Sequence, residues 1–261
     1  MKSKILRFLF TEIVILKRSF ILTRRFTILS KKIAILQSSY IPWKGYFDII
    51  NSVDEFVIYD TAGYSKNGWR NRNRITGPNG TRWLTIPVRV TRHNQPINEV
   101  RIHDFRWPAK HWKSLVANYG GSPFFRSYAQ ALERLYESLA EEPYLTTINI
   151  AFLRFTSRLL GISTPFSMAE DLNDIQDPTE KLIRLCQIRG ATSYVTGPSA
   201  SDYLRPRRFE EENIRVEWMN YDNYPEYPQR GVPFNHAVSI LDLIFWTGPE
   251  ATKYMKSFSH A

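Results

Sequence analysis

An arginine-rich stretch in the first third of the chain is the strongest sign of chemistry in this sequence. Arg70, Arg72 and Arg74 alternate with Asn71 and Asn73. On a β-strand, this period-two spacing places the arginines on one face and the amides on the other. Such a strand is either a solvated edge ribbon or an anion-binding ribbon, because guanidinium groups match the geometry of phosphate and carboxylate. We favour the anion-binding interpretation.

Three side chains are candidates for the general base of a group-transfer reaction, in the order Asp60, His111 and Asp242. Carboxylates and imidazoles can remove a proton from an attacking group. His111, which lies among tryptophans, also suits a hydrogen-bonded structural role. Ser239 and Asp242 have the spacing of a helix N-cap with an acid in the first turn, and we favour the cap for Ser239. Asp242 can face a site if the start of that helix points there.

The elements that must position these groups begin with a predicted strand–helix–strand unit. Short apolar runs at 33–36 and 56–59 flank a turn and a helical apolar stripe, a pattern typical of a βαβ unit. Ligands of such sheets bind at the carboxyl ends of the strands. Because Gln37 and Tyr40 follow the first strand and Asp60 follows the second, we expect these three residues at one mouth.

A β-hairpin should follow, with strands at 69–75 and 82–88 around the turn signal at 77–80. We expect its arginines to converge with Tyr40, Asp60 and nearby aromatic rings in a single pocket for a charged small molecule.

The rest of the chain predicts a single α/β domain over 32–261. Three helical patterns suggest a helical insertion at about 107–160. The fold class is a mixed sheet with flanking helices, Rossmann-like or nucleotidyltransferase-like in its first half, with a β-hairpin and that insertion. Further strands are expected at 97–102, 162–167, 191–196 and 214–219, and further helices at 178–189, after Gly197 and at 238–246.

Charge is distributed unevenly along the chain. The net charge is +10, but residues 1–32 alone carry +8. Residues 61–98 contain seven Lys and Arg residues and no Asp or Glu, so the rest of 33–261 is about −5. A local positive patch on a slightly acidic body favours a small anionic ligand over a long polyanion, and we expect no nucleic-acid partner.

The first 31 residues alternate short apolar runs with basic residues. No run reaches the roughly 20 apolar residues of a transmembrane helix, and no signal-peptide pattern is present. We expect a poorly ordered basic extension, and an over-early start codon would account for it. The alternative is a basic amphipathic helix that makes weak contact with a membrane surface.

Recognisable cofactor and metal motifs are missing from the sequence. The histidines are scattered, and there is no Walker loop, Rossmann glycine fingerprint or nucleophile elbow. We therefore identify no cofactor and no metal. The single cysteine, Cys186, lies in an apolar helical pattern and is expected in the core rather than as a nucleophile.

Taken together, the spacing of these residues resembles that of the WbqC-like family over about 32–255. The resemblance rests on a block from Gln37 to Phe47, on Asp54–Asp60, on the stretch from Tyr64 to Val88, and on blocks near Gly197 and from Tyr227 to Leu243. Two positions depart from the family pattern: Ser38, where proline is usual, and Gly63, where glutamine is common. The family lacks an extension like residues 1–31, which supports the over-early start.

The resemblance implies a cytoplasmic bacterial protein of surface-polysaccharide, O-antigen or lipopolysaccharide biosynthesis, with a nucleotide sugar or other phosphorylated small molecule as partner. Our leading hypothesis is a transferase that moves an acyl or aminoacyl-type group to an amino sugar. The alternatives are a non-catalytic nucleotide-sugar-binding or scaffold protein of the same pathway and an RNA-binding module. Residues expected to contact the substrate are Gln37, Tyr40, Trp43, Gly45, Lys66, Trp69, Asn71, Arg72, Asn73, Arg74, Gly197, Tyr203, Tyr227, Gln229 and Ser239.

Overall fold

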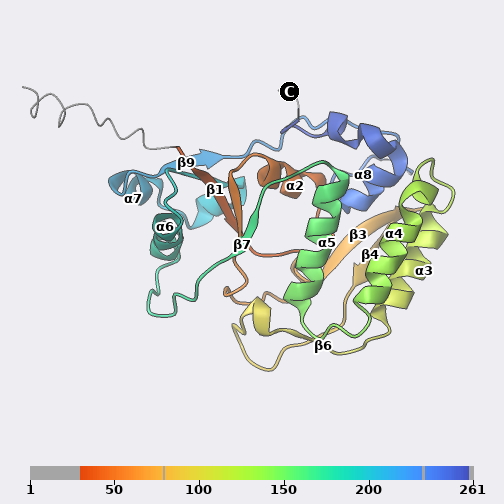
Figure 1. The fold of residues 1–261 in the computed structure, drawn as a ribbon, viewed down its shortest axis with the longest axis horizontal. Coiled ribbons are helices and arrows are strands. Elements are labelled where there is room, and N and C mark those ends of the chain that lie inside the picture. The colour runs from red at the N-terminus through yellow and green to blue at the C-terminus, as the bar shows by residue number, and fades with distance from the viewer. Residues whose placement is uncertain (1–29, 79, 231–232, 259–261) are drawn as a thin grey trace, which may run out of the picture. The chain divides into compact units, whose positions relative to one another are not determined.

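The computed structural model describes residues 30–258 except 79 and 231–232 (Figure 1). The chain divides into residues 1–30 and a compact unit of residues 31–261, which contains all the helices and strands described below. The predicted basic extension lies outside the described residues, apart from its last two positions. No helix among the described residues has the length and apolar character needed to cross a bilayer.

A parallel five-stranded sheet forms the centre of the unit, in the order β7-β2-β1-β8-β9. Its strands are β1 (Lys32–Leu36), β2 (Glu55–Ile58), β7 (Phe166–Met168), β8 (Ser193–Thr196) and β9 (Arg215–Trp218). The predicted βαβ unit is confirmed, because β1 and β2 pair in parallel and α2 (Lys44–Asn51) connects them. The chain builds outward from β1 through β2 to β7, then crosses to β8 on the other side of β1. The boundary between β1 and β8 is therefore the topological switch point, where open α/β sheets bind ligands.

Consecutive apolar residues of β1 point to alternate faces of the sheet, so helices can cover both faces. Ile33 and Ile35 of β1 face a core that contains α6 (Pro178–Ile188) and Phe209 of α7 (Pro206–Glu211). Ala34 faces the opposite core, which contains α2 and α8 (Ile240–Thr247). Figure 1 shows α6 and α7 on one side of the strands and α2, α5 and α8 on the other. This period-two division of apolar residues gives a three-layer α/β fold, as predicted.

Cys186 of α6 is fully buried in the first of these cores, and burial raises the pKa of its thiol to about 12. The prediction that this cysteine belongs to the core is confirmed.

The arginine-rich stretch forms the predicted hairpin. Strand β3 (Arg72–Gly77) pairs antiparallel with β4 (Gly80–Thr85), and Gly77 pairs with Gly80 at the turn. Gly80 has a φ of 93°, a conformation that glycine adopts at little cost. The alternation on β3 has a clear result: Asn73 and Ile75 are buried, whereas Arg72 and Arg74 lie on the opposite, partly exposed face.

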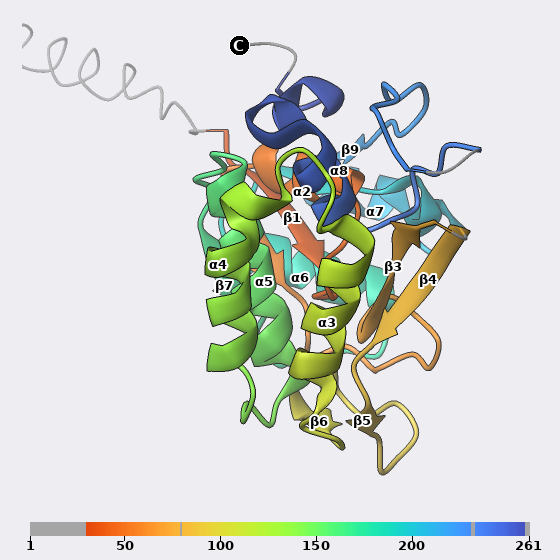
Figure 2. The same ribbon diagram turned by 90° about the vertical axis from the view of Figure 1, so that its right-hand side faces the viewer.

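The predicted helical insertion consists of α3 (Trp107–Tyr119), α4 (Phe125–Ser138) and α5 (Leu145–Leu159). These helices enclose a third apolar core with the inner face of the hairpin, which includes Ile75 and Leu84. Figure 2 shows the hairpin beside α3. The long arginine-rich ribbon is thus supported from one side only, and its other face is left for solvent or a ligand.

Between the hairpin and the insertion, the structure differs from the sequence-based expectation. The strand predicted at 97–102 is divided into a 3-10 turn, η1 (Ile97–Glu99), and the short strand β6 (Arg101–Ile102), which pairs with β5 (Val88–Arg89). Pro96 precedes η1, and its fixed φ and missing N–H suit the entry to a turn rather than a ladder. The last elements are η2 (Pro198–Asp202) after β8 and η3 (Gly248–Tyr254) after α8.

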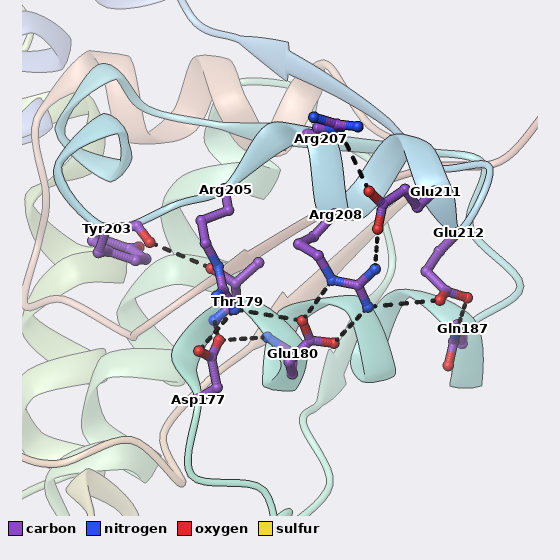
Figure 3. A network of polar contacts seen from close by, with 10 residues as sticks. All are labelled: Asp177, Thr179, Glu180, Gln187, Tyr203, Arg205, Arg207, Arg208, Glu211 and Glu212. Atoms are coloured by element: carbon purple, nitrogen blue, oxygen red, sulfur yellow. Dashed lines mark hydrogen bonds and ion pairs between the residues drawn. The ribbon is translucent and has the colours of Figure 1, made fainter.

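A charged network on the surface joins α6 to α7 (Figure 3). Nε of Arg208 lies 3.0 Å from Oε1 of Glu180, and Arg205 pairs with Asp177 at 2.7 Å. Next to this network, the hydroxyl of Thr179 donates to the carbonyl of Tyr203 at 3.3 Å. The network thereby holds the segment between β8 and α7, which carries part of the candidate site.

Candidate functional site

A cavity of about 530 Å³ opens at the switch point of the sheet, and we call it the sheet-edge cavity. Gln37 follows β1 and Gly197 follows β8, so the carboxyl ends of both central strands reach it. Its size suits a small-molecule ligand. The residues that line it are Leu36, Gln37, Ser39, Pro42, Trp43, Tyr46, Ile49, Trp69, Arg70, Asn73, Thr196, Gly197, Ser199, Ala200, Tyr203, Tyr221, His236 and Ala237.

Aromatic side chains from four segments of the chain line the sheet-edge cavity. Trp43 packs edge-on against Tyr221, with ring centroids 4.9 Å apart. Trp69 and Tyr203 are exposed by 39% and 52%. Exposed aromatic rings beside a cavity provide faces on which a base or a sugar ring can stack.

The cavity has a positive charge and no carboxylate among its described lining residues. Nη1 of Arg70 donates to the carbonyls of Gln37 at 2.9 Å and Ser38 at 3.3 Å, which fixes the guanidinium at the wall. Its Nε is buried and has no hydrogen-bond partner among the described residues. A fixed guanidinium next to aromatic rings suits a phosphorylated ligand.

A strained loop between β1 and α2 forms one edge of the cavity. Ile41 has a φ of 38°, which is rare for a β-branched residue. The side-chain amide of Asn73 donates to the carbonyls of Tyr40 and Ile41 at 3.2 and 2.9 Å and holds this conformation. Backbone strain of this kind is concentrated at functional sites. Gly45 allows the ring of Trp43 to pack close to the backbone of this loop, because a Cβ at position 45 would clash with that ring.

His236 is the titratable side chain that sequence reasoning missed. It lies in the loop after Tyr221, lines the sheet-edge cavity, and has a buried Nδ1 with no hydrogen-bond partner among the described residues. Burial, and to a lesser extent the charge of Lys44, lowers its pKa below the usual value. A lowered pKa favours the neutral imidazole, the form that can accept a proton. The only sequence signal was its place in a proline- and tyrosine-rich loop ahead of the final helix.

The predicted catalytic residue Asp60 follows β2 but is fully buried and does not line the sheet-edge cavity. It accepts hydrogen bonds from the Ser38 backbone at 2.7 Å, from the Ser38 hydroxyl at 2.6 Å and from Thr146 at 2.7 Å. Burial raises its pKa, while these bonds and the nearby Arg70 oppose the rise. Ser38 thus supplies two bonds that a proline at this position could not make.

His111 is also buried, with both ring nitrogens engaged. Because the carbonyl of Thr85 can only accept, Nε2 carries the proton and donates to it at 3.1 Å. Nδ1 then accepts from the hydroxyl of Tyr40 at 2.9 Å, and Tyr40 accepts from Tyr136 at 2.7 Å. Burial lowers the pKa of His111 to about 4. The chain of hydrogen bonds joins the β1–α2 loop to β4 and the helical insertion.

Asp242, the third predicted catalytic residue, lies in the first turn of α8 and is fully buried. It accepts from Tyr119 at 2.6 Å, from Tyr227 at 2.8 Å, from Gln229 at 2.9 Å and from Thr76. Ser239 is the N-cap of α8 and accepts from the Leu241 backbone, as the sequence predicted.

The Asp242 contacts have a consequence for His236. The side-chain amide of Gln229 donates to the Asn235 carbonyl at 3.1 Å and accepts from the Asn235 N–H at 2.8 Å. Asp242 therefore fixes, through Gln229, the residue that immediately precedes His236. It is a positioning residue for the sheet-edge cavity.

The expected single pocket does not form. Tyr40 and Asp60 are buried in the core. The guanidinium of Arg72 lies over the ring of Trp83 at 4.2 Å, and that of Arg74 lies 5.4 Å from the ring of Trp69 and 5.3 Å from that of Trp83. Six of the residues predicted to contact the substrate line the sheet-edge cavity: Gln37, Trp43, Trp69, Asn73, Gly197 and Tyr203. Lys66, Asn71 and Arg72 instead line a second cavity.

The fold and this cavity define a three-layer α/β protein with a cavity at the topological switch point of its sheet. The chain belongs to the WbqC-like protein family, whose model matches residues 37–254, and the resemblance read from the motifs is confirmed. It is similar to a protein of Mycobacterium tuberculosis named uncharacterized protein Rv1507c, with 45% identity over 229 residues, which cover 87% of this chain and 98% of the relative. No solved structure matches the chain.

Proposed function

We propose that this protein is a transferase of bacterial surface-polysaccharide biosynthesis that binds a nucleotide-linked amino sugar in the sheet-edge cavity. The observation that carries the proposal is the meeting of aromatic faces, a fixed guanidinium and the imidazole of His236 at the switch point of the sheet. Membership of the WbqC-like family supports the connection with polysaccharides.

In this proposal, binding and chemistry use different parts of the cavity. Trp43, Trp69 and Tyr203 stack on the base or sugar, and Arg70 holds a phosphate. The sugar amine attacks the carbonyl carbon of an activated acyl or aminoacyl donor. The new bond is an amide C–N bond, the donor's bond to its leaving group breaks, and His236 takes the amine proton.

Titration calorimetry with a panel of nucleotide-linked amino sugars tests the binding step. We expect at least one to bind the wild type and to lose about tenfold in affinity in Tyr203→Ala, the cost of one stacking contact. Phe105→Ala is the matched control, because Phe105 is similarly exposed, at 47%, and lines neither cavity. No binding of any sugar nucleotide, or equal losses in both variants, would contradict the proposal.

Mass spectrometry of the same sugars after incubation with the protein and a bacterial lysate, which supplies donors, tests the chemistry. The wild type should add the mass of an acyl or aminoacyl group to the sugar. His236→Gln should bind the sugar but leave it unmodified.

A non-catalytic sugar-nucleotide-binding protein is the second candidate, favoured by the full burial and internal hydrogen bonding of Asp60 and Asp242. It predicts binding without any mass gain in the wild type.

A further inference from the structure

A second cavity, of about 870 Å³, lies at the open end of the hairpin, where β3 begins and β4 ends, and we call it the loop cavity. The segment that lines the sheet-edge cavity with Trp69 and Arg70 continues directly into it with Asn71 and Arg72. Its lining residues are Gly63, Tyr64, Ser65, Lys66, Asn67, Asn71, Arg72, Thr85, Ile86, Pro87, Val88, Val90, Arg92, His93 and Asn94.

The loop cavity is cationic. Lys66, Arg72 and Arg92 are among its described lining residues, which include no Asp or Glu. Arg92 is paired with Glu99 at 2.6 Å outside the lining, so the excess charge comes mainly from Lys66 and Arg72. Like charges gathered around one hollow repel each other, and an anionic ligand relieves that repulsion.

The guanidinium of Arg72 is held in place before any ligand arrives. It stacks on Trp83 at 4.2 Å and donates a hydrogen bond to the carbonyl of Asn67. Its Nε is buried without a hydrogen-bond partner among the described residues. A pre-positioned guanidinium loses less side-chain entropy when it binds phosphate.

The two loops that close the cavity are also fixed in an unusual conformation. Asn67 and Asn94 both have positive φ, at 65° and 51°. The loops are joined to each other, because the N–H of Tyr64 donates to the carbonyl of Gln95 at 2.8 Å. Strained but cross-linked loops around a charged hollow are typical of ligand sites.

We propose that the loop cavity is a second ligand site that binds a small phosphate-bearing molecule. The site is independent of the sugar-nucleotide proposal. Its volume is that of a small-molecule pocket, and its two uncompensated cations match one phosphate or diphosphate group. An extended RNA strand would instead need a long basic groove with stacking faces.

Titration calorimetry with inorganic pyrophosphate tests the site directly. We expect saturable binding that weakens at least tenfold in Arg72→Gln and several-fold in Lys66→Gln. Arg82→Gln is the matched control: Arg82 is exposed on the same hairpin, does not line the cavity, and should leave binding unchanged. Lys66 is exposed, so Lys66→Gln tests the site even if Arg72→Gln fails to fold.

Three results would overturn the inference. They are no saturable pyrophosphate binding to the wild type, equal weakening in Arg82→Gln and Arg72→Gln, and tight binding only of a single-stranded RNA oligonucleotide with a steep salt dependence. The titration contains no sugar, so its failure is separate from a failure of the proposed function.

Discussion

The two cavities are neighbours along the chain but are built differently. The sheet-edge cavity stands on the ends of β1 and β8, and buried hydrogen-bonded side chains around Asp60 and Asp242 fix its loops. The loop cavity is made from a hairpin face and two short loops, and charge dominates its lining. The sheet-edge cavity can therefore select a ligand by shape and ring stacking, whereas the loop cavity can recognise little beyond negative charge.

Replacement of Asp242 should have the largest effect, because four donors converge on it inside the core. Asp242→Ala leaves those donors unpaired, and we expect a loss of about 3–5 kcal/mol in the free energy of unfolding. Urea denaturation measures the loss. Asp174→Ala, at an exposed position, is the control and should change stability by less than about 0.5 kcal/mol. A loss below about 1 kcal/mol in Asp242→Ala would show that the sheet-edge cavity does not depend on this support.

His111 should make stability depend on pH, because burial lowers the pKa of its imidazole. Its ring bonds to Tyr40 on one side and to Thr85, in the lining of the loop cavity, on the other. Its pKa is about 4 in the folded protein, against about 6.5 in the unfolded chain. The unfolded chain therefore gains the proton first, so stability is full above pH 6.5 and falls as the pH drops to about 4.

The expected loss over that interval is roughly 3 kcal/mol. Urea denaturation at a series of pH values measures it, and His111→Gln should flatten the curve between pH 6.5 and 4. An unchanged curve in His111→Gln would assign the pH dependence to other groups.

A pair of tryptophan variants separates the two regions by ligand rather than by stability. Trp69 lines the sheet-edge cavity, and Trp83 stacks near it at 5.4 Å but lines neither cavity. Trp69→Ala should weaken sugar-nucleotide binding about tenfold, whereas Trp83→Ala should change it less than about threefold. Calorimetry on both variants decides, and equal losses would mean that the ligand lies along the whole hairpin face.

The smallest effect is expected at the surface network behind Tyr203 (Figure 3). Arg208→Ala removes contacts to Glu180 and Glu211, but these groups are partly exposed to solvent, which screens them. We expect the melting temperature to fall by less than about 3 °C, and by less still in 1 M NaCl. A fall of 10 °C by differential scanning calorimetry would show that the rim of the sheet-edge cavity is held mainly by charge.

Most of the fold could be predicted because periodicity reports which residues are buried. The apolar runs at 33–36 and 56–59 predicted the βαβ unit, and the turn signal at 77–80 predicted the hairpin. The departures are local: a 3-10 turn follows Pro96 in the strand predicted at 97–102, and the strand predicted at 162–167 begins only at Phe166. The mouth of the sheet was also predictable, since Gln37 and Gly197 follow strands. This is the part of the site that depends on local structure.

The rest of the site depends on contacts between distant segments, which spacing cannot reveal. Asp60 follows a strand as a ligand-binding acid would, yet Thr146, 86 positions away, donates to it and helps enclose it in the core. Arg70, rather than Arg72 or Arg74, reaches the switch point because it binds the carbonyls of Gln37 and Ser38. The pairing of Gln229 with Asn235 helps to place the neighbouring His236 at the cavity.

A crystal structure of the protein soaked with a nucleotide-linked amino sugar would show directly whether the sheet-edge cavity binds that ligand. We expect electron density for the sugar nucleotide in the sheet-edge cavity, with a ring stacked on Trp69 or Tyr203 and a phosphate oxygen within hydrogen-bond distance of Arg70. Density confined to the loop cavity, or to the outer face of the hairpin, would contradict it.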